Sequence, residues 1–401
     1  TRVDENGLVN YAEVIGGEKI TNGDGSSTSG WDLAYPNTTL SIDNNNLRAT
    51  ANSSGAYGLS QSLSLDTSKQ YIIKATIDVD NASGGTANLR IATNSNLSSG
   101  TTTLSTATGT STTILSPSAT TMYIGIADTA IDSSNYVEID NISVKQLDRD
   151  NVPRIDYTGG GCPHILAEPQ RTNLIPYSED LTNAFYLTTG IGTVTESTTL
   201  SPDGTSYGYT ITPTSSATNH YFNYNYGQLT VVIGDEVTYS IFVKPNGYNF
   251  IQLASSSGFP AKYQNFELTG DGVIGTGDIS GKTIEKIGDW YRCSVTETAS
   301  GVNPRFLLSP SETALATRNP VYSGNGTDGV LGWGVQVEVG SYPTSLIPNF
   351  GTAAGVTRNQ DIFTRDGIGS LINSTEGVLF AEIAALDTTI DSGYLSLNNG
   401  G

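Results

Sequence analysis

Cys162 and His164 are the first residues whose types suggest chemistry, because the chain has only two cysteines and two histidines and one of each lies in "GCPHIL". A cysteine nucleophile works beside an imidazole that takes up the thiol proton. Here Pro163 separates the two residues and three glycines precede them, so no regular helix or strand is expected to hold them in register. The pattern favours a structural connector over an active site.

Motifs of other enzyme classes do not occur in the sequence. There is no GxSxG, no HExxH and no phosphate-binding loop, since the glycine-rich segments 23–30 and 269–281 lack the lysine and the strand-to-helix setting. A glycosidase needs two carboxylates about 5 to 9 Å apart with one pKa raised, and a count of 39 acidic residues cannot establish such a pair. We therefore predict that these residues carry no enzymatic activity.

Aromatic side chains are concentrated in "NHYFNYNYGQL" at residues 219–229. Sugar binding needs apolar ring faces beside planar polar groups, so Tyr221, Tyr224 and Tyr226 are the candidate glycan-binding residues. Aromatic residues on alternate positions are equally typical of a sandwich core, and one face of this run is therefore expected to pack inside. The tryptophans lie in strand-like segments and are assigned to the core: Trp31, Trp290 and Trp333.

The charge balance excludes some partners. Lys and Arg number 19 against 39 Asp and Glu, a net charge of −20, and no basic run occurs that could replace the counterions of a nucleic acid. Anionic polysaccharides would be repelled at long range, which favours neutral glycans or bridging by divalent cations. Since no stretch approaches the roughly 18 apolar residues of a membrane span, no membrane insertion is expected.

The elements that must position these residues are predicted to be strands. Apolar and polar residues alternate with a period of two in the segments 71–79, 122–128, 136–147, 237–244 and 291–297. Clusters of Gly, Asn, Ser and Asp separate them and supply the backbone conformations of turns. The fold class is therefore predicted as all-β, with tandem antiparallel β-sandwich (jelly-roll) domains joined by an irregular Pro/Gly-rich connector.

The second cysteine lies in one of these predicted strands. Cys293 shares an alternating face with Tyr291 and Val295, which predicts a buried small apolar residue. Two cysteines cannot form a disulfide scaffold, so both are expected to be thiols.

Two complete sandwiches and part of a third are predicted. The boundaries are 1–9 for an entry segment, 10–147 for the first sandwich, 148–170 for the connector, 171–347 for the second sandwich, and 348–401 for a further connector and the start of an incomplete third sandwich. The connector between the first two holds three prolines, a triple glycine and no alternation, so it is expected to run over the surface.

Several segments, in the same order, resemble the modular fibre and spike proteins of tailed bacteriophages. They are "TRVDENGLV", "VPRIDYTGGGCPHILAEPQRTNLIPYSEDLTNAFY", "IFVKPNGYNFIQL", "GDWYRCSV", "GWGVQVEVGSYPTSLIP" and "LINSTEGVLFAEIAAL". Residues 10–147 resemble, more loosely, a carbohydrate-binding jelly roll, and the start of the third unit is similar to a concanavalin-like lectin sandwich.

This resemblance implies a structural fibre or spike of the virion, on the head or the tail, that attaches to glycans of the host surface. It implies a homotrimer with other virion proteins as partners, assembled in the bacterial cytoplasm where thiols stay reduced. No cofactor is required. In such jelly rolls a structural calcium often lies between the opening loop and the closing strand, which here would recruit Asp24 and Asp140 with backbone carbonyls near Ile20 and Asn22; the oxygen-rich composition also suits calcium.

Two alternatives remain open from the sequence. The same sandwiches would serve as an accessory binding module of a secreted bacterial polysaccharide-degrading enzyme. They would also serve as a structural spacer that binds no glycan. The upstream sequence would discriminate between a virion-anchoring segment and a signal peptide.

Overall fold

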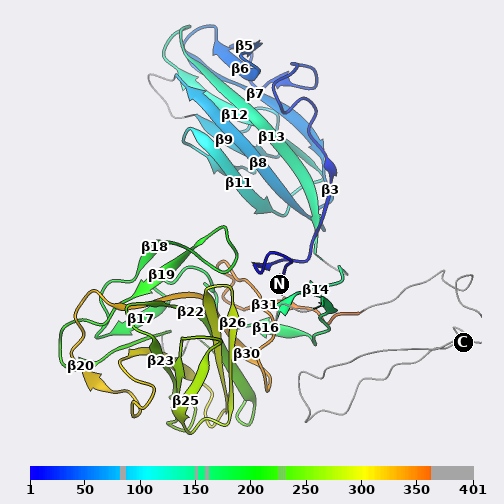
Figure 1. Ribbon diagram of the computed structural model, residues 1–401. Helices are drawn as coiled ribbons and strands as arrows, with labels where there is room; N and C mark the ends of the chain where they lie inside the picture. The colour runs from blue at the N-terminus through cyan, green and yellow to red at the C-terminus, as the bar shows by residue number, and fades with distance from the viewer. Residues whose placement is uncertain are drawn as a thin grey trace, which may run out of the picture. The chain divides into compact units, whose positions relative to one another are not determined.

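Regular structure in the described part of the chain is entirely β. The residues that the computed structural model describes are 1–81, 87–149, 152–158, 162–224, 227, 229 and 231–362 (Figure 1). Within them no α-helix occurs, so there is also no helix that could cross a bilayer, and the strands of every sheet pair antiparallel. The prediction of an all-β chain with tandem antiparallel sandwiches is confirmed.

The chain divides into two compact units. The first sandwich comprises Glu13–Val152, and the second sandwich comprises Thr1–Ala12 with the residues from Pro153 onward. The segment predicted as an entry, 1–9, and most of the predicted connector, 148–170, are thus grouped with the second sandwich.

The first sandwich is built from two packed sheets (Figure 1). One has the order β10, β9, β12, β7, β4, with strands β4 (Asp32–Leu33), β7 (Gly55–Ser64), β9 (Asn88–Ala92), β10 (Thr102–Ser105) and β12 (Thr121–Ala130). The other has the order β11, β8, β13, β6, β5 with β3 paired to β13, and its strands are β3 (Val14–Glu18), β5 (Thr38–Asp43), β6 (Asn46–Ala51), β8 (Gln70–Asp80), β11 (Gly109–Leu115) and β13 (Tyr136–Asp148).

Alternation in the sequence places the core of the first sandwich. In β8, Tyr71, Ile73, Ala75 and Ile77 are buried while the residues between them are at least partly exposed. Successive side chains of a strand point to opposite faces of the sheet, so these four share the inner face. They pack in one cluster with apolar residues of the facing sheet, such as Ile124.

The second sandwich also has two main sheets. One has the order β17, β21, β28, β23, β24, β25, with strands β17 (Tyr186–Thr189), β21 (Tyr221–Tyr224), β23 (Phe250–Ser256), β24 (Tyr263–Glu267), β25 (Val273–Gly277) and β28 (Arg305–Ser311). The other, here called the pocket sheet, has the order β18, β19, β30, β22, β27, β26, with strands β18 (Thr195–Leu200), β19 (Tyr207–Ile211), β22 (Glu236–Asn246), β26 (Gly281–Ile287), β27 (Trp290–Thr298) and β30 (Gly329–Val339).

Four short strand pairs complete this unit. They are β1 (Arg2–Val3) with β2 (Val9–Asn10), β14 (Ile155–Asp156) with β15 (His164–Ile165), β16 (Arg171–Asn173) with β31 (Val356–Arg358), and β20 (Thr218–Asn219) with β29 (Val321–Tyr322). The predicted connector therefore contains one regular hairpin, β14–β15. Through the β16–β31 pair, residues 356–358 near the end of the described chain lie beside residues 171–173.

The central strands of the pocket sheet, β22, β27 and β30, are buried on both faces, unlike the strands of an ordinary outer sheet. Ten of the eleven residues of β30 are buried. Its inner face includes Val335 and Cys293 in the sandwich core, while its outer face carries Phe242 and Trp333, which pack with Val3 of the N-terminal hairpin in a separate cluster. A sheet covered on both sides needs apolar residues on both, which explains why alternation fades in β30.

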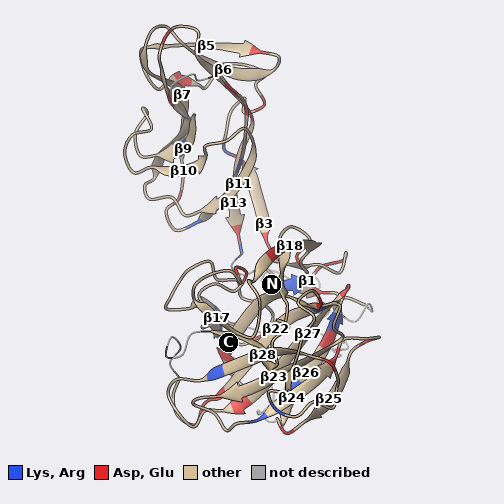
Figure 2. Cartoon of the chain, turned by 90° about the vertical axis from the view of Figure 1, so that its left-hand side faces the viewer, with Lys and Arg blue, Asp and Glu red and all other residues tan. Residues whose placement is uncertain are grey.

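Several predictions about single residues are confirmed by this packing. Cys293 is fully buried, Cys162 is exposed, and both are free thiols. The three tryptophans are buried: Trp31, Trp290 and Trp333. Most of the ribbon in Figure 2 carries no charged residue, and acidic and basic positions are scattered over both units. The two strands expected to begin a third sandwich, at 377–386 and 393–401, lie outside the described residues.

The core of the second sandwich predicts a large contrast between two leucines. Leu308 in β28 is 0 % exposed and Leu315 is 74 % exposed. We expect Leu308→Ala to lower the free energy of unfolding of this unit by about 2–5 kcal/mol, because it removes buried methyl groups and leaves a cavity. Leu315→Ala should change it by less than about 0.5 kcal/mol. Urea unfolding followed by fluorescence of Trp290 and Trp333 measures both, and equal effects would contradict the assignment of this core.

Candidate functional site

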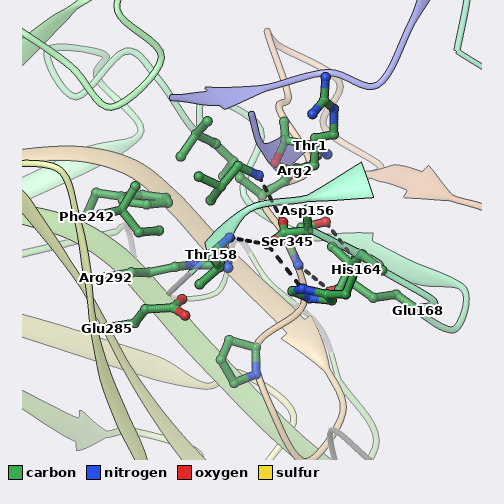
Figure 3. A pocket seen from close by; sticks show the side chains of 16 residues that line it. Thr1, Arg2, Asp156, Thr158, His164, Glu168, Phe242, Glu285, Arg292 and Ser345 are labelled. Carbon is green, nitrogen blue, oxygen red and sulfur yellow. Dashed lines mark hydrogen bonds and ion pairs between the residues drawn. The ribbon is translucent and has the colours of Figure 1, made fainter. Parts of the chain in front are cut away.

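A cavity lies over the outer face of the pocket sheet, within the second sandwich. Its floor is a row of three residues on adjacent strands, in which Arg292 of β27 stands opposite Phe242 of β22 on one side and opposite Glu285 of β26 on the other (Figure 3). Directly opposed residues in a sheet share a face, so the three side chains project to the same side. The cavity has a volume of about 330 Å³.

Three chain segments that are far apart in the sequence form its walls. They are the N-terminal hairpin β1–β2, the hairpin β14–β15 with the residues that follow it, and the loop 343–346. Val3 and Leu346 contribute apolar surface, and Asp156 and Ser345 contribute polar groups. The cavity thus combines apolar walls with a few polar side chains, which is typical of a small-molecule site.

Arg292 is the buried cation of this cavity. Its Nη2 donates to the carbonyl oxygen of Thr344 at 2.6 Å and to Oγ of Ser240 at 3.1 Å, and its guanidinium lies over the ring of Phe242 at 5.3 Å from the centroid. Burial lowers the pKa of Arg292, and the attraction of Glu338, Glu285 and Glu168 offsets only part of this effect. These contacts fix the guanidinium at the floor of the cavity.

Asp156 holds two of the wall segments together. Its Oδ2 accepts a hydrogen bond from the backbone N–H of Val3 at 2.9 Å, and its Oδ1 accepts one from the N–H of Thr158 at 2.8 Å. His164 pairs with Asp156 across the hairpin, with its Nε2 3.9 Å from Oδ1. His164 therefore faces a carboxylate, and no hydrogen bond to Cys162 is found in the described part of the chain. The interpretation of Cys162 and His164 as parts of a connector fits this arrangement.

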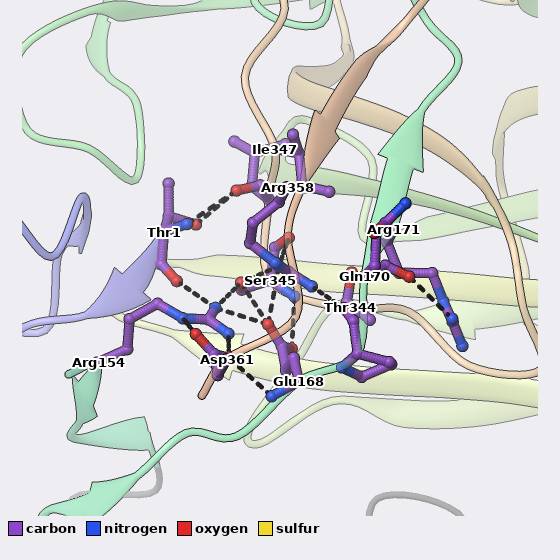
Figure 4. A network of polar contacts seen from close by, with 12 residues as sticks. Thr1, Arg154, Glu168, Gln170, Arg171, Thr344, Ser345, Ile347, Arg358 and Asp361 are labelled. Atoms are coloured by element: carbon purple, nitrogen blue, oxygen red, sulfur yellow. Dashed lines mark hydrogen bonds and ion pairs between the residues drawn. The ribbon is translucent and has the colours of Figure 1, made fainter. Parts of the chain in front are cut away.

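A network of buried charges lies beside the cavity (Figure 4). Oε2 of Glu168 accepts hydrogen bonds from Nη1 of Arg154 at 2.6 Å and from Oγ of Ser345 at 2.7 Å, and it lies 2.8 Å from Nη1 of Arg358. Arg154 also donates through Nη1 to the carbonyl oxygen of Thr1 at 3.1 Å and pairs with Asp361. The network therefore joins the N-terminal segment, the connector and the segment that follows the second sandwich.

The network stabilises the ionised forms of Glu168 and Arg154. Burial alone would raise the pKa of Glu168, but Arg358 and Arg154 outweigh it and hold that pKa below its usual value. Burial alone would lower the pKa of Arg154, but Asp361 and Glu168 raise it. Two arginines and two carboxylates thus balance one another away from water.

The structure separates the candidate glycan residues. His220, Phe222 and Tyr224 alternate on one face and are buried, and Oη of Tyr224 donates to the carbonyl oxygen of Pro304 at 3.0 Å. This corrects the expectation for Tyr224, because a ring in the core has no face left for a sugar. Tyr221 points to the opposite face and is partly exposed, and it stays a prediction. Tyr226 lies outside the described residues.

The two candidate calcium ligands come from neighbouring segments. A Cβ at Gly23 would lie 2.0 Å from the carbonyl oxygen of Ile142, so the loop that carries Asp24 runs directly against β13, which carries Asp140. Oδ1 of Asp24 accepts from Oγ of Ser26 at 2.6 Å, whereas Oδ1 of Asp140 is buried without a partner among the described residues.

These two aspartates do not by themselves fit a calcium site. Calcium takes about six to eight oxygen ligands. Within the described ranges no group of three or more His, Cys, Asp or Glu residues could hold a metal ion. Calcium binding stays a prediction for Asp24 and Asp140.

Sequence reasoning missed the residues that build the cavity. Arg292 stands in "WYRCSV", where an arginine between aromatic and apolar neighbours on a strand was the available signal. Arg154 and Glu168 each lie next to a proline in the connector, a place where charged residues are ordinarily solvated. Nothing local indicates that the pair of Arg154 and Glu168 forms or lies beside the cavity of Arg292, because segments distant in the sequence bring them there.

Comparisons with known proteins find structural similarity but no sequence family. No family model and no curated protein matches the chain. It is similar to the tandem CBM22-1–CBM22-2 domain of Paenibacillus barcinonensis Xyn10C, with 12% identity, a TM-score of 0.31, and coverage of 83% of this chain and 100% of that one.

Two further solved structures show weaker similarity. The enzymatically active domain of tailspike protein 4 of bacteriophage CBA120 matches with 15% identity and a TM-score of 0.24, covering 32% of this chain and 21% of that one. The M60 catalytic domain with CBM51-1 and CBM51-2 of Clostridium perfringens ZmpB matches with 9% identity and a TM-score of 0.20, covering 74% and 34%. The chain spans about a fifth of the length of the first of these two and about a third of the second, and such similarities carry no assignment of function.

The buried network predicts unequal effects for two ion pairs of the second sandwich. Arg154→Met should destabilise this unit by about 3–5 kcal/mol, because Glu168 and Asp361 would lose a buried partner. Lys244→Met removes the pair with Asp289, whose side chain is 83% exposed, and should cost less than about 1 kcal/mol. Urea unfolding measures both changes; a small effect at Arg154 would show that the network does not hold the segments together.

Glu168 also predicts a pH dependence. Since the pKa of Glu168 is lowered in the folded state, its contribution to stability is present above the unfolded value of about 4.3 and is lost as the pH falls through the folded value. Glu168→Gln should therefore lower the urea midpoint at pH 7 and flatten its fall between pH 5 and 3. Glu5→Gln, at an exposed position, is the matched control and should follow the wild type. Parallel curves for the wild type and Glu168→Gln would contradict this role.

Proposed function

We propose that this chain is a structural fibre or spike protein of a tailed-bacteriophage virion that attaches to glycans of the host surface through its β-sandwiches. The observation that carries the proposal is the cavity of the second sandwich. Its lining includes a hydrogen-bond donor, Arg292, and an acceptor, Asp156, together with apolar walls. Sugar hydroxyls both donate and accept, and sugar C–H faces need apolar surface, so this chemistry suits a glycan.

The sequence resemblance supports the same role. Three of the segments that resemble phage fibre proteins surround the cavity: "VPRIDYTGGGCPHIL" supplies Asp156, "GDWYRCSV" supplies Arg292, and "GSYPTSLIP" supplies Ser345. Segments that resemble one family thus converge in space although they are distant in sequence. A shared binding or joining surface is the simplest reason for such convergence.

The proposed assembly is a homotrimer within the virion, with other virion proteins as partners, and the proposed role is binding without catalysis. A single sandwich gains little free energy from one sugar, with dissociation constants on the order of 0.1 to 1 mM. A fibre that repeats its sites gains avidity, which makes such weak sites useful.

The proposal predicts binding that depends on multivalent display. Whole protein coupled at high density to beads should retain beads on arrays of bacterial surface glycans, whereas beads that carry the unfolded protein should not. Calcium and a chelator should be compared in parallel arms, since calcium binding is a separate prediction. Absence of retention on every glycan would contradict attachment and favour a structural spacer.

Location is tested independently of binding. Electron microscopy of virions labelled with antibodies against this chain should place the label at regular positions on the head or the tail. Label on secreted enzyme and none on virions would instead favour the accessory module of a polysaccharide-degrading enzyme.

A further inference from the structure

Arg292 has hydrogen-bonding capacity that the protein does not use. Its Nη2 is engaged by Thr344 and Ser240, and its Nε is buried without a partner. Its Nη1 makes no hydrogen bond to any described residue and is not among the buried atoms that lack partners, so this end of the guanidinium keeps access to the cavity. Two N–H donors are therefore available to a ligand.

Acceptors with spare capacity stand near this donor. Each oxygen of Asp156 accepts one backbone N–H, which leaves at least one lone pair on each. Glu285 stands directly opposite Arg292, yet no hydrogen bond or ion pair of its carboxylate is found in the described part of the chain. Loss of hydration raises the pKa of Glu285, Arg292 lowers it, and Asp156 raises it further, so the two carboxylates repel each other across the cavity.

This arrangement of charge selects against charged ligands. A ligand carboxylate that approached Arg292 would also approach Glu285 and Asp156, which already repel each other. A ligand ammonium near the carboxylates would be repelled by Arg292. A hydroxyl group is repelled neither by the carboxylates nor by Arg292, because it can accept from the guanidinium and donate to a carboxylate at the same time.

We infer that this cavity binds one neutral pyranose ring, an inference that rests on the proposed function. One hydroxyl of the ring accepts from Nη1 of Arg292, and the neighbouring hydroxyl donates to Glu285 or Asp156. Ile287 and Leu346 supply apolar surface for the C–H face of the ring. A volume of about 330 Å³ lies at the low end of the range of ligand sites, about 300 to 1,000 Å³. The cavity therefore takes a single sugar unit of a glycan.

The experiment is calorimetric titration of the whole protein with methyl glycosides of glucose, galactose and mannose, each beside its uronic acid and its 2-amino derivative. We expect at least one neutral glycoside to bind with a dissociation constant on the order of 0.1 to 1 mM. Its uronic acid and its 2-amino derivative should bind at least about tenfold more weakly. A uronic acid that binds more tightly than its neutral parent would overturn the inference.

Three variants locate the site. Arg292→Met should weaken binding of the neutral glycoside by more than about tenfold. Glu285→Gln, at an exposed position, should lower the ratio of the affinities for the neutral sugar and its uronic acid by about threefold or more. Arg305→Met is the control: Arg305 is partly buried and, like Arg292, donates to a serine Oγ, that of Ser256, but it does not line the cavity, and binding should be unchanged. Circular dichroism checks the fold of each variant.

The outcomes separate this inference from the proposed function. If a neutral glycoside binds and both Glu285→Gln and a folded Arg292→Met leave affinity and selectivity unchanged, the cavity is not the site, although glycan attachment stands. If no glycoside binds and multivalent display on the glycan array also fails, the inference and the proposed function fall together.

Discussion

Two charged side chains of the second sandwich, Arg154 and Glu168, lie almost out of contact with water. Removing such groups from water costs several kcal/mol per ion unless hydrogen bonds replace the hydration. Here the replacement comes from distant stretches of chain: the carbonyl of Thr1, Ser345 of the loop after the last long strand, and Asp361 beyond it. These stretches must converge for the pair to be tolerated, and their convergence also builds the walls of the cavity. The geometry of the candidate site is thus a consequence of where two charges are neutralised.

Much of the fold could be predicted from the sequence because a half-buried strand has apolar residues at every second position, and these identify its inner face. In β8 the buried residues occupy every second position, and in β27 Cys293 lies on the face predicted for it. The pocket sheet was harder to predict because its outer face is covered. Ten buried residues in β30 leave no alternation, and the residues that cover its neighbour β22, such as Val3, are more than 200 positions away in the sequence.

The candidate site could be predicted least. Alternation in the aromatic run correctly indicated that one face packs inside, but it could not tell which face, and Tyr224 proved to be on the core side. Arg292 and Asp156 carry no local pattern of binding residues, since their partners come from other segments. Alternation in a strand predicts which of its two faces is buried. It does not predict which distant segment of the chain covers that face.

The segment that carries Arg358 and Asp361 lies beyond the boundary at residue 347 that the sequence suggests for the second sandwich. Glu168 contacts Arg358, and Arg154 contacts Asp361. Modular proteins evolve by exchanging domains, and an exchange that broke the chain at 347 would separate these partners and leave buried charges unmatched. The unit that can be inherited intact is therefore longer than the sandwich itself: it includes Arg154, Asp361 and the N-terminal segment whose Thr1 carbonyl accepts from Arg154.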